Sequence, residues 1–195
     1  MTANEFLLLW INQSWANPLF DGLFWWLSQR GWFALPLWLL FAAFTIRHAG
    51  PASWRFLLAL LLVVAFGDVV GNLLKNLFAE YRPCFDLYPQ LRSVDGQIKQ
   101  CGEASTGMPS NHALNFFSAA TFIAFSTPWS QWKKVFFVIA ILVCVSRIYL
   151  GKHYPSQVVI GAILGYLLAY GAVLVARHYR MTLPVTTPNT IHHAA

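Results

Sequence analysis

Three short segments of the sequence carry the residue types that phosphate-ester chemistry needs. Arginine offers a planar fork of donors to phosphate oxygens, and lysine offers a point charge. Histidine titrates near neutrality, so one imidazole can attack phosphorus while another protonates the leaving oxygen. We therefore predict a phosphate-ester hydrolase site with a histidine nucleophile, built from Lys75, Arg82, Ser110, His112, Arg147 and His153.

The middle segment, residues 109–112, reads Pro-Ser-Asn-His and comes directly before an apolar run. Proline followed by serine is a natural helix opening, with free backbone N–H groups and the positive end of the dipole aimed at an anion. The Ser110 hydroxyl could donate to the same phosphate. Simpler roles stay open: Ser110 and Asn111 could only cap the helix, and Lys75 alone could be an interfacial residue that reaches toward water.

Metal ligation is the competing role for the histidines. The sequence contains no His-x-x-x-His and no Cys-x-x-Cys, and its few carboxylates are scattered. We therefore expect a metal-independent site that needs no cofactor. The remaining histidines lie on the opposite face or in the tail and receive no role: His48, His178, His192 and His193.

The composition places these segments in an integral membrane protein. Of 195 residues, 57% are hydrophobic and 10% are charged, and the mean hydropathy of +0.53 exceeds that of ordinary soluble domains. The net charge of +6 lies at the ends of apolar runs and in the motifs. It therefore indicates membrane topology and anionic lipid, and we expect no nucleic-acid partner.

The apolar runs predict an all-α bundle of five or six transmembrane helices, since a span needs about 20 residues. We expect residues 1–180 to form one membrane domain and residues 181–195 a disordered tail. Residues 1–14 lack a basic leader and a cleavage site, so we expect them to be retained. Residues 1–27 form either an interfacial helix or a poor first span. The later runs lie at 32–45, from 56 onward, and at 112–125, 134–145 and 155–175, with a polar loop at 80–107.

The run that begins at residue 56 carries a polar face. Asp68, Asn72 and Lys75 follow one another at steps of four and three, so they share one side of a helix. An unpaired charge at that depth is costly, and this side should face the protein or a wet cavity. Asp68 could pair with Lys75 or supply negative charge to the site.

Charge and cysteine predict which side of the membrane the motifs face. The end of the bundle opposite the motifs carries most of the basic residues that lie outside them, and the positive-inside rule then places the motifs outside the cytoplasm. Cys84 and Cys101 flank the loop on the motif side, where a disulfide could form; two free cysteines are the alternative. Cys144 lies inside an apolar run and is simplest as a packing residue.

Together the segments resemble the type 2 phosphatidic acid phosphatase family of membrane lipid phosphatases, whose signatures are K-x6-R-P, P-S-G-H and S-R-x5-H-x3-D. The resemblance covers roughly residues 60–175 and preserves order and spacing. It implies that His153 is a nucleophile that forms a phosphohistidine and that His112 is the acid for the leaving group. It also implies a phosphate cradle that comprises Lys75, Arg82, Ser110 and Arg147, with Asn111 and Ser146 from the same motifs.

Two positions depart from the family pattern. Asn111 replaces glycine, which leaves the local backbone N–H available. Gln157 stands where the family usually has an aspartate that orients the nucleophilic imidazole. Branches that resemble glucose-6-phosphatase and dolichyl diphosphatase also have glutamine there. One helical turn after His153, the Gln157 amide oxygen can accept from the imidazole N–H and fix the tautomer.

The resemblance implies a multi-pass enzyme of the bacterial inner membrane whose site faces the periplasm or exterior. The compact form resembles small bacterial undecaprenyl diphosphatases, so we expect hydrolysis of the terminal phosphate of a polyprenyl diphosphate. Phosphatidylglycerophosphate, phosphatidate and lipid A 1-phosphate are the alternative substrates. The bilayer and a phosphorylated lipid are the expected partners, with no obligatory protein partner evident. A catalytically silent lipid-binding or transport protein is the alternative of another class.

Overall fold

The computed structural model describes residues 1–94 and 105–183, and every regular element within those ranges is a helix. This confirms the all-α class. The elements are, in order, α1 (Ala3–Leu9), η1 (Trp10–Ser14), α2 (Pro18–Leu27), η2 (Arg30–Ala34), α3 (Leu35–Ala49), η3 (Gly50–Ala52), α4 (Ser53–Phe78), α5 (Pro83–Asp86), α6 (Asn111–Ser126), α7 (Ser130–Tyr149) and α8 (Pro155–His178).

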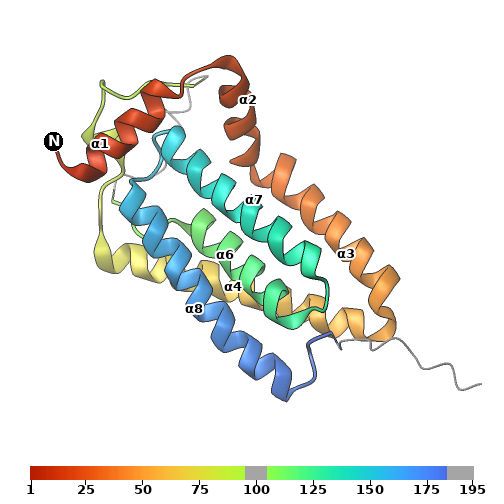
Figure 1. The fold of residues 1–195 in the computed structure, drawn as a ribbon. Helices are drawn as coiled ribbons and strands as arrows, with labels where there is room; N and C mark the ends of the chain where they lie inside the picture. Colours follow the sequence, from red (N-terminus) through yellow and green to blue (C-terminus); the bar gives the residue numbers. More distant parts are fainter. Residues whose placement is uncertain (95–104, 184–195) are drawn as a thin grey trace, which may run out of the picture.

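Helix α6 lies at the centre of the bundle, with α4, α7 and α8 packed around it (Figure 1). Small residues on these helices allow the backbones to approach closely, which is how helices associate in lipid. A Cβ at Gly165 of α8 would overlap the backbone of Leu114 in α6, and the Ser118 hydroxyl donates to the Gly165 carbonyl at 3.1 Å. The first turn of α6 is thereby held firmly against α8.

Three segments of the described chain are long and apolar enough to cross a membrane: Gly31–Ala49, Ser53–Asp86 and Pro155–His178. The outward faces of the bundle carry large apolar side chains such as Leu61, Leu73 and Leu167, as lipid contact requires. Helices α6 and α7, with 16 and 20 residues, run alongside these segments (Figure 1). The expected count of five or six spans thus includes α6 and α7, which length and apolar composition alone do not identify as spans.

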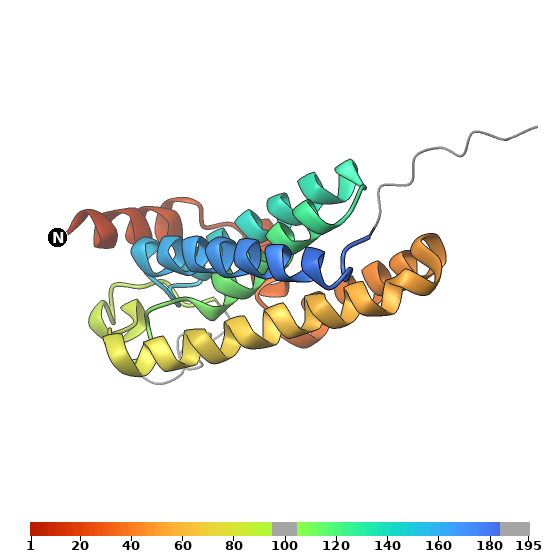
Figure 2. The same cartoon turned by 90° about the horizontal axis from the view of Figure 1, so that it is seen from below.

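The N-terminal segment lies at one end of the bundle (Figures 1 and 2). Helix α1 has seven residues and α2 has ten, and each is too short to cross a bilayer alone. Residues Met181 and Leu183 bond back to the bundle through their backbone N–H groups. Residues 181–183 of the expected tail are thus bonded to the bundle, and residues 184–195 lie outside the described ranges.

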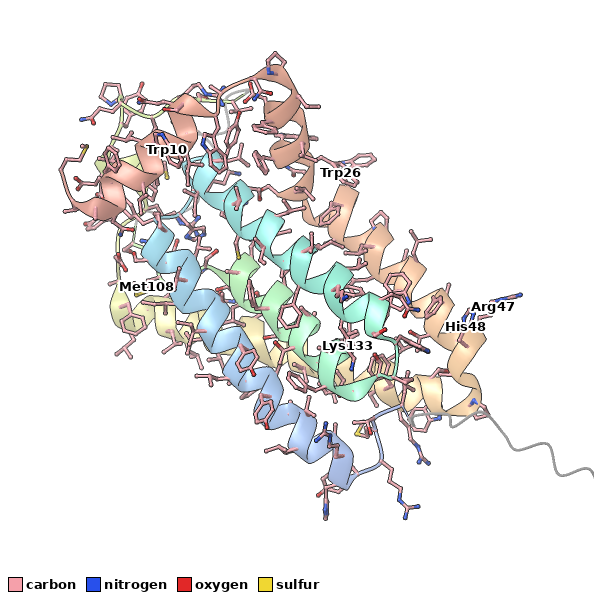
Figure 3. The ribbon with its side chains drawn as sticks, viewed as in Figure 1. Trp10, Trp26, Arg47, His48, Met108 and Lys133 are labelled. Atoms are coloured by element: carbon pink, nitrogen blue, oxygen red, sulfur yellow. The ribbon has the colours of Figure 1, made fainter. Side chains whose placement is uncertain are left out.

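The two ends of the bundle differ in the residues that they present. Arg47, His48 and Lys133 lie toward the end opposite Trp10 and Met108 (Figure 3). Met108 directly precedes the Pro-Ser-Asn-His segment. Arg47 and Lys133, two of the basic residues behind the topology prediction, thus lie toward the end of the bundle opposite the motifs.

Candidate active site

His153 lies in the tight turn between α7 and α8 and is 2% exposed. The Arg147 carbonyl holds this turn by accepting from the backbone N–H groups of Lys152 and His153 at 3.0 and 3.3 Å. The imidazole Nδ1 lies 2.9 Å from the Gly107 carbonyl and 3.2 Å from Gln157 Oε1. Because both neighbours are acceptors, Nδ1 must carry the hydrogen, and the lone pair is left on Nε2.

The Gln157 amide is fixed at both ends. Its Oε1 also accepts from the Tyr154 N–H at 3.1 Å, and its Nε2 donates to the Tyr81 carbonyl at 2.8 Å. Gln157 is fully buried, so these bonds are not exchanged with bulk water. The predicted contact between Gln157 and His153 is present, and the amide orients the imidazole without bringing a charge to it.

Cations from three segments converge on His153. Burial lowers the pKa of His153 well below its usual value, and the charges of Arg147, Arg82 and Lys75 lower it further. The bond from Gln157 acts in the opposite direction. The resting imidazole is therefore neutral near pH 7, as a nucleophile must be.

Lys152 belongs to the same cluster of cations. It is 8% exposed, and burial, together with the charges of Arg147 and Arg82, lowers its pKa to about 8. The sequence analysis gave this lysine no role, although its place directly before His153 was the available signal.

Ser110 occupies the N-cap position of α6, and its N–H donates to the Gln157 carbonyl at 3.1 Å. Its side chain makes no capping bond. The hydroxyl is fully buried and has no hydrogen-bond partner among the described residues. Buried polar groups normally have a hydrogen-bond partner, so this hydroxyl is a candidate to bind a ligand. The simpler role as a helix cap is not the one that the structure shows.

Two other candidates for the phosphate cradle have side chains directed elsewhere. The Ser146 hydroxyl donates to the Val143 carbonyl at 2.6 Å within α7, so it has no hydrogen left for an anion. Asn111 Nδ2 donates to Asp68 Oδ1 at 2.9 Å and to Asn72 Oδ1 at 2.8 Å. These two side chains are therefore held within the protein, and phosphate binding by residues 111 and 146 stays a prediction.

The Asp68 carboxylate is bound by amide side chains of α4 and α6. Its carboxylate accepts from Asn111, from Asn115 at 3.0 Å and from Asn72 at 3.5 Å. Three amide donors therefore bind the Asp68 carboxylate.

Sequence reasoning missed three residues that support the site. Gly107 supplies the carbonyl that holds His153, and a Cβ there would lie 2.6 Å from the Tyr81 carbonyl and 2.7 Å from the Glu80 carbonyl. Ser28, at the C-terminus of α2, accepts from Arg147 Nη1. Thr106 accepts from Arg82 Nε at 3.2 Å. Only Gly107 left a signal, as a glycine close to the Pro-Ser-Asn-His segment.

His112 is half-buried in the first turn of α6 and lines a cavity of about 370 Å³. Asp68 and Asn115 lie on the same lining. The rest of the lining is apolar and comes from η2, α3, α4 and α6, with Trp38, Leu61 and Phe116 among its residues. The proposed acid thus borders a space that suits an apolar group.

The cysteines are only partly described. Cys84 is buried and disulfide-bonded. Cys101 lies outside the described residues, so its pairing with Cys84 stays a prediction. Cys144 is free and buried in α7, in keeping with a packing role.

Comparison with solved structures identifies the architecture. A structure of LpxE from Aquifex aeolicus superposes with a TM-score of 0.70, covering 89% of this chain and 96% of that one at 23% identity. A phosphatidylglycerolphosphate phosphatase from Bacillus subtilis superposes with a TM-score of 0.64 over 91% of this chain and 88% of that one, also at 23% identity. At this identity the likeness shows the fold alone.

The relatives in sequence include proteins named as phosphatases and one named as a transport permease. Phosphatidylglycerophosphatase B of Bacillus subtilis is 30% identical over 82% of this chain and 75% of its own length. The bacitracin transport permease protein BcrC of Bacillus licheniformis is 32% identical over 58% of this chain, and the chain spans 53% of that protein. A lipid A 4'-phosphatase of Porphyromonas gingivalis is 27% identical over 79% of this chain and 65% of its own length.

A family model settles the relationship across the site. The model of the PAP2 superfamily matches residues 56–181. This range includes all three motifs, the Gly107 and Gln157 supports of His153, and the helices that carry them. The chain belongs to the PAP2 superfamily.

Proposed function

We propose that the protein is a membrane lipid phosphatase that removes the terminal phosphate of a polyprenyl diphosphate, such as undecaprenyl diphosphate, through a phosphohistidine at His153. One observation carries the proposal. The His153 Nδ1 lies within bonding distance of two acceptors, while the charges of Arg147, Arg82 and Lys75 lower the pKa of the same imidazole. This leaves a neutral Nε2 lone pair in a place prepared for an anion.

The reaction then takes two steps. In the first, His153 Nε2 attacks the terminal phosphorus, an N–P bond forms, and the bond from phosphorus to the bridging oxygen breaks. The bridging oxygen keeps the electron pair and leaves on the lipid monophosphate, with a proton from His112. In the second step, water attacks the phosphohistidine, its proton passes to His112, and phosphate leaves as the N–P bond breaks.

The cradle stabilises the charge that builds up on the equatorial oxygens. Lys75, Arg82 and Arg147 supply cations, and the Ser110 hydroxyl supplies the buried donor described above. Lys152 adds a further positive charge near neutral pH. A diphosphate is more strongly charged than a monoester, so this supply of cations supports the diphosphate assignment. No metal is required in these steps.

The cavity beside His112 supports a lipid as the leaving group. Its lining is apolar apart from His112, Asp68 and Asn115, and it lies among helices whose outer faces carry large apolar residues. The first isoprene units of the substrate would occupy it. The names of the relatives keep phosphatidylglycerophosphate and lipid A phosphates as alternative substrates. A catalytically silent lipid-binding or transport protein is the alternative of another class.

We further propose that the chain is a multi-pass protein of the bacterial inner membrane with this site on its outer side. The concentration of Arg47, Lys133 and other basic residues at the opposite end supports that orientation.

A phosphate-release assay tests the function. Purified protein in detergent, without added divalent metal, should release phosphate from undecaprenyl diphosphate faster than from phosphatidylglycerophosphate, phosphatidate or lipid A 1-phosphate. His153→Ala should abolish release, because the nucleophile is gone. His178→Ala is the matched control, since His178 is exposed at the far end of α8, and it should retain activity. Full activity in His153→Ala, or a strict metal requirement, would contradict the mechanism.

A further inference from the structure

Four polar side chains meet between α4 and α6: Asn111 is buried, Asp68 and Asn115 are half-buried, and Asn72 is exposed. Asp68 and Asn72 come from α4, and Asn111 and Asn115 come from α6. Asp68 Oδ1 accepts from Asn111 at 2.9 Å and from Asn115 at 3.0 Å. An ionised carboxylate can only accept, so the amide nitrogens must face it. We call this set the amide lock.

Asn111 is the member that the lock holds most completely. Its side-chain nitrogen has two hydrogens, and Asp68 and Asn72 provide two acceptors, at 2.9 and 2.8 Å. The residue is 4% exposed. No hydrogen remains for a phosphate, and the amide oxygen would repel one. The Asn111 side chain therefore has a role other than that of a phosphate ligand.

Gly71 of α4 makes room for this side chain. A Cβ at residue 71 would lie 2.5 Å from Asn111 Oδ1, closer than real Cβ contacts allow, and 3.1 Å from its Cγ, which is also tight. Asn111 itself cannot retreat without breaking its bonds to Asp68 and Asn72. The asparagine at position 111 and the glycine at position 71 are therefore sterically linked.

The lock lies between two parts of the phosphate site. Asn111 is the first residue of α6 and stands between Ser110 and His112. Lys75 follows Gly71 by one helical turn on α4. Any slippage of α4 along α6 would change the spacing between the Lys75 cation and the first turn of α6.

We propose that Asn111 is a positioning residue: seated on Gly71 and held by Asp68 and Asn72, it fixes the first turn of α6, with Ser110 and His112, relative to Lys75 on α4. The proposal rests on the phosphatase function above and deepens it. It also accounts for the departure from the family's glycine, because the asparagine side chain occupies a space that α4 leaves open with a glycine of its own.

A double-mutant cycle between positions 71 and 111 tests the proposal. Gly71→Ala should lower kcat about tenfold or more in the parent protein, because the added methyl displaces Asn111. Asn111→Gly should lower kcat several-fold with a smaller change in KM, since α6 loses its tie but no phosphate contact. In the Asn111→Gly background, Gly71→Ala should cost less than about twofold, because the clash is absent.

Gly67→Ala is the matched control. Gly67 lies one turn earlier on the same face of α4, and a Cβ there would meet Leu114 Cδ2 at 2.6 Å, with Asn115 Oδ1 at 3.3 Å. Asn111→Gly should therefore not rescue Gly67→Ala. Thermal unfolding in detergent, measured on all variants, should show the same pattern of rescue in the melting temperature.

Equal costs of Gly71→Ala in both backgrounds, in kcat and in melting temperature, would overturn the proposal. A change in KM alone for Asn111→Gly would overturn it too, since that is the signature of a phosphate ligand. If the parent protein releases no phosphate from any substrate, the proposed function fails by itself. The melting temperatures would then still decide whether positions 71 and 111 are linked.

Discussion

At the residue scale, the site depends on how a neutral amide replaces the family's usual carboxylate. Gln157 accepts from the His153 Nδ1–H, and the Gly107 carbonyl is a second acceptor for the same N–H. The tautomer is therefore secured by two groups without added charge. The imidazole is less basic as a result: burial and the charges of Arg147, Arg82 and Lys75 lower the pKa of His153, and the bond from Gln157 acts in the opposite direction.

This balance predicts the pH dependence of the enzyme. The imidazole must be neutral to attack, and its pKa lies below the usual value, so kcat/KM should stay high as pH falls through about 6.5 and decline only at lower pH. Gln157→Glu places a carboxylate beside Nδ1, which stabilises the imidazolium and raises the pKa of His153. The acidic limb should then move to higher pH by about one unit or more.

The comparison is made between pH profiles of the two proteins on the same substrate, because the ionisation of the substrate then cancels. Gln131→Glu, at an exposed position near the start of α7, is the control and should leave the profile unchanged. An acidic limb that does not move in Gln157→Glu would mean that His153 is not the group that titrates.

At the element scale, contacts between residues close in sequence could be predicted, and contacts that depend on how two helices pack could not. The contact from Gln157 to His153 was predictable because a spacing of four residues near a helix start brings side chains together. The roles of Asn111 and Ser146 were not. Each could donate to a phosphate or to a neighbouring backbone or side chain, and only the docking of α4 on α6 decides which partner is nearer.

The contribution of α2 was equally hidden. Ser28 reaches Arg147 because α2 packs on the end of α7, and a network across the chain holds it there. Arg92 donates to both Asp21 oxygens, at 3.1 and 2.6 Å, and to Tyr149 at 2.8 Å. These partners are far apart in sequence, and no periodicity links them. The short N-terminal helices therefore serve the site, which their ambiguous composition did not indicate.

At the scale of the whole molecule, composition was sufficient for the class and motif order was sufficient for the family. The central place of α6 follows from its small and apolar residues, which let α4, α7 and α8 surround it. Helices α6 and α7 are harder to recognise as membrane spans from the sequence, since α6 is short and α7 carries Lys133, Lys134 and Arg147. Their positions beside longer apolar helices become clear only in the assembled bundle (Figure 1).

The same arrangement predicts the topology. Gln90 lies in the described part of the motif-side loop, and Gln131 lies near the start of α7, and both are exposed. A membrane-impermeant maleimide should label Gln90→Cys in intact spheroplasts and Gln131→Cys only after lysis, because the positive-inside rule predicts a cytoplasmic location for the basic end. Cys144 is buried and should contribute little background. The reverse labelling pattern would place the site on the cytoplasmic side.

The central claim is that His153 becomes phosphorylated during turnover. The most direct measurement is a rapid quench at alkaline pH of the protein turning over undecaprenyl diphosphate with a radiolabelled terminal phosphate, followed by peptide mapping. The account predicts label on the peptide that contains His153, stable in base and lost in acid, and no such label in His153→Ala. Continued phosphate release with no label on that histidine, or label on another residue, would contradict it.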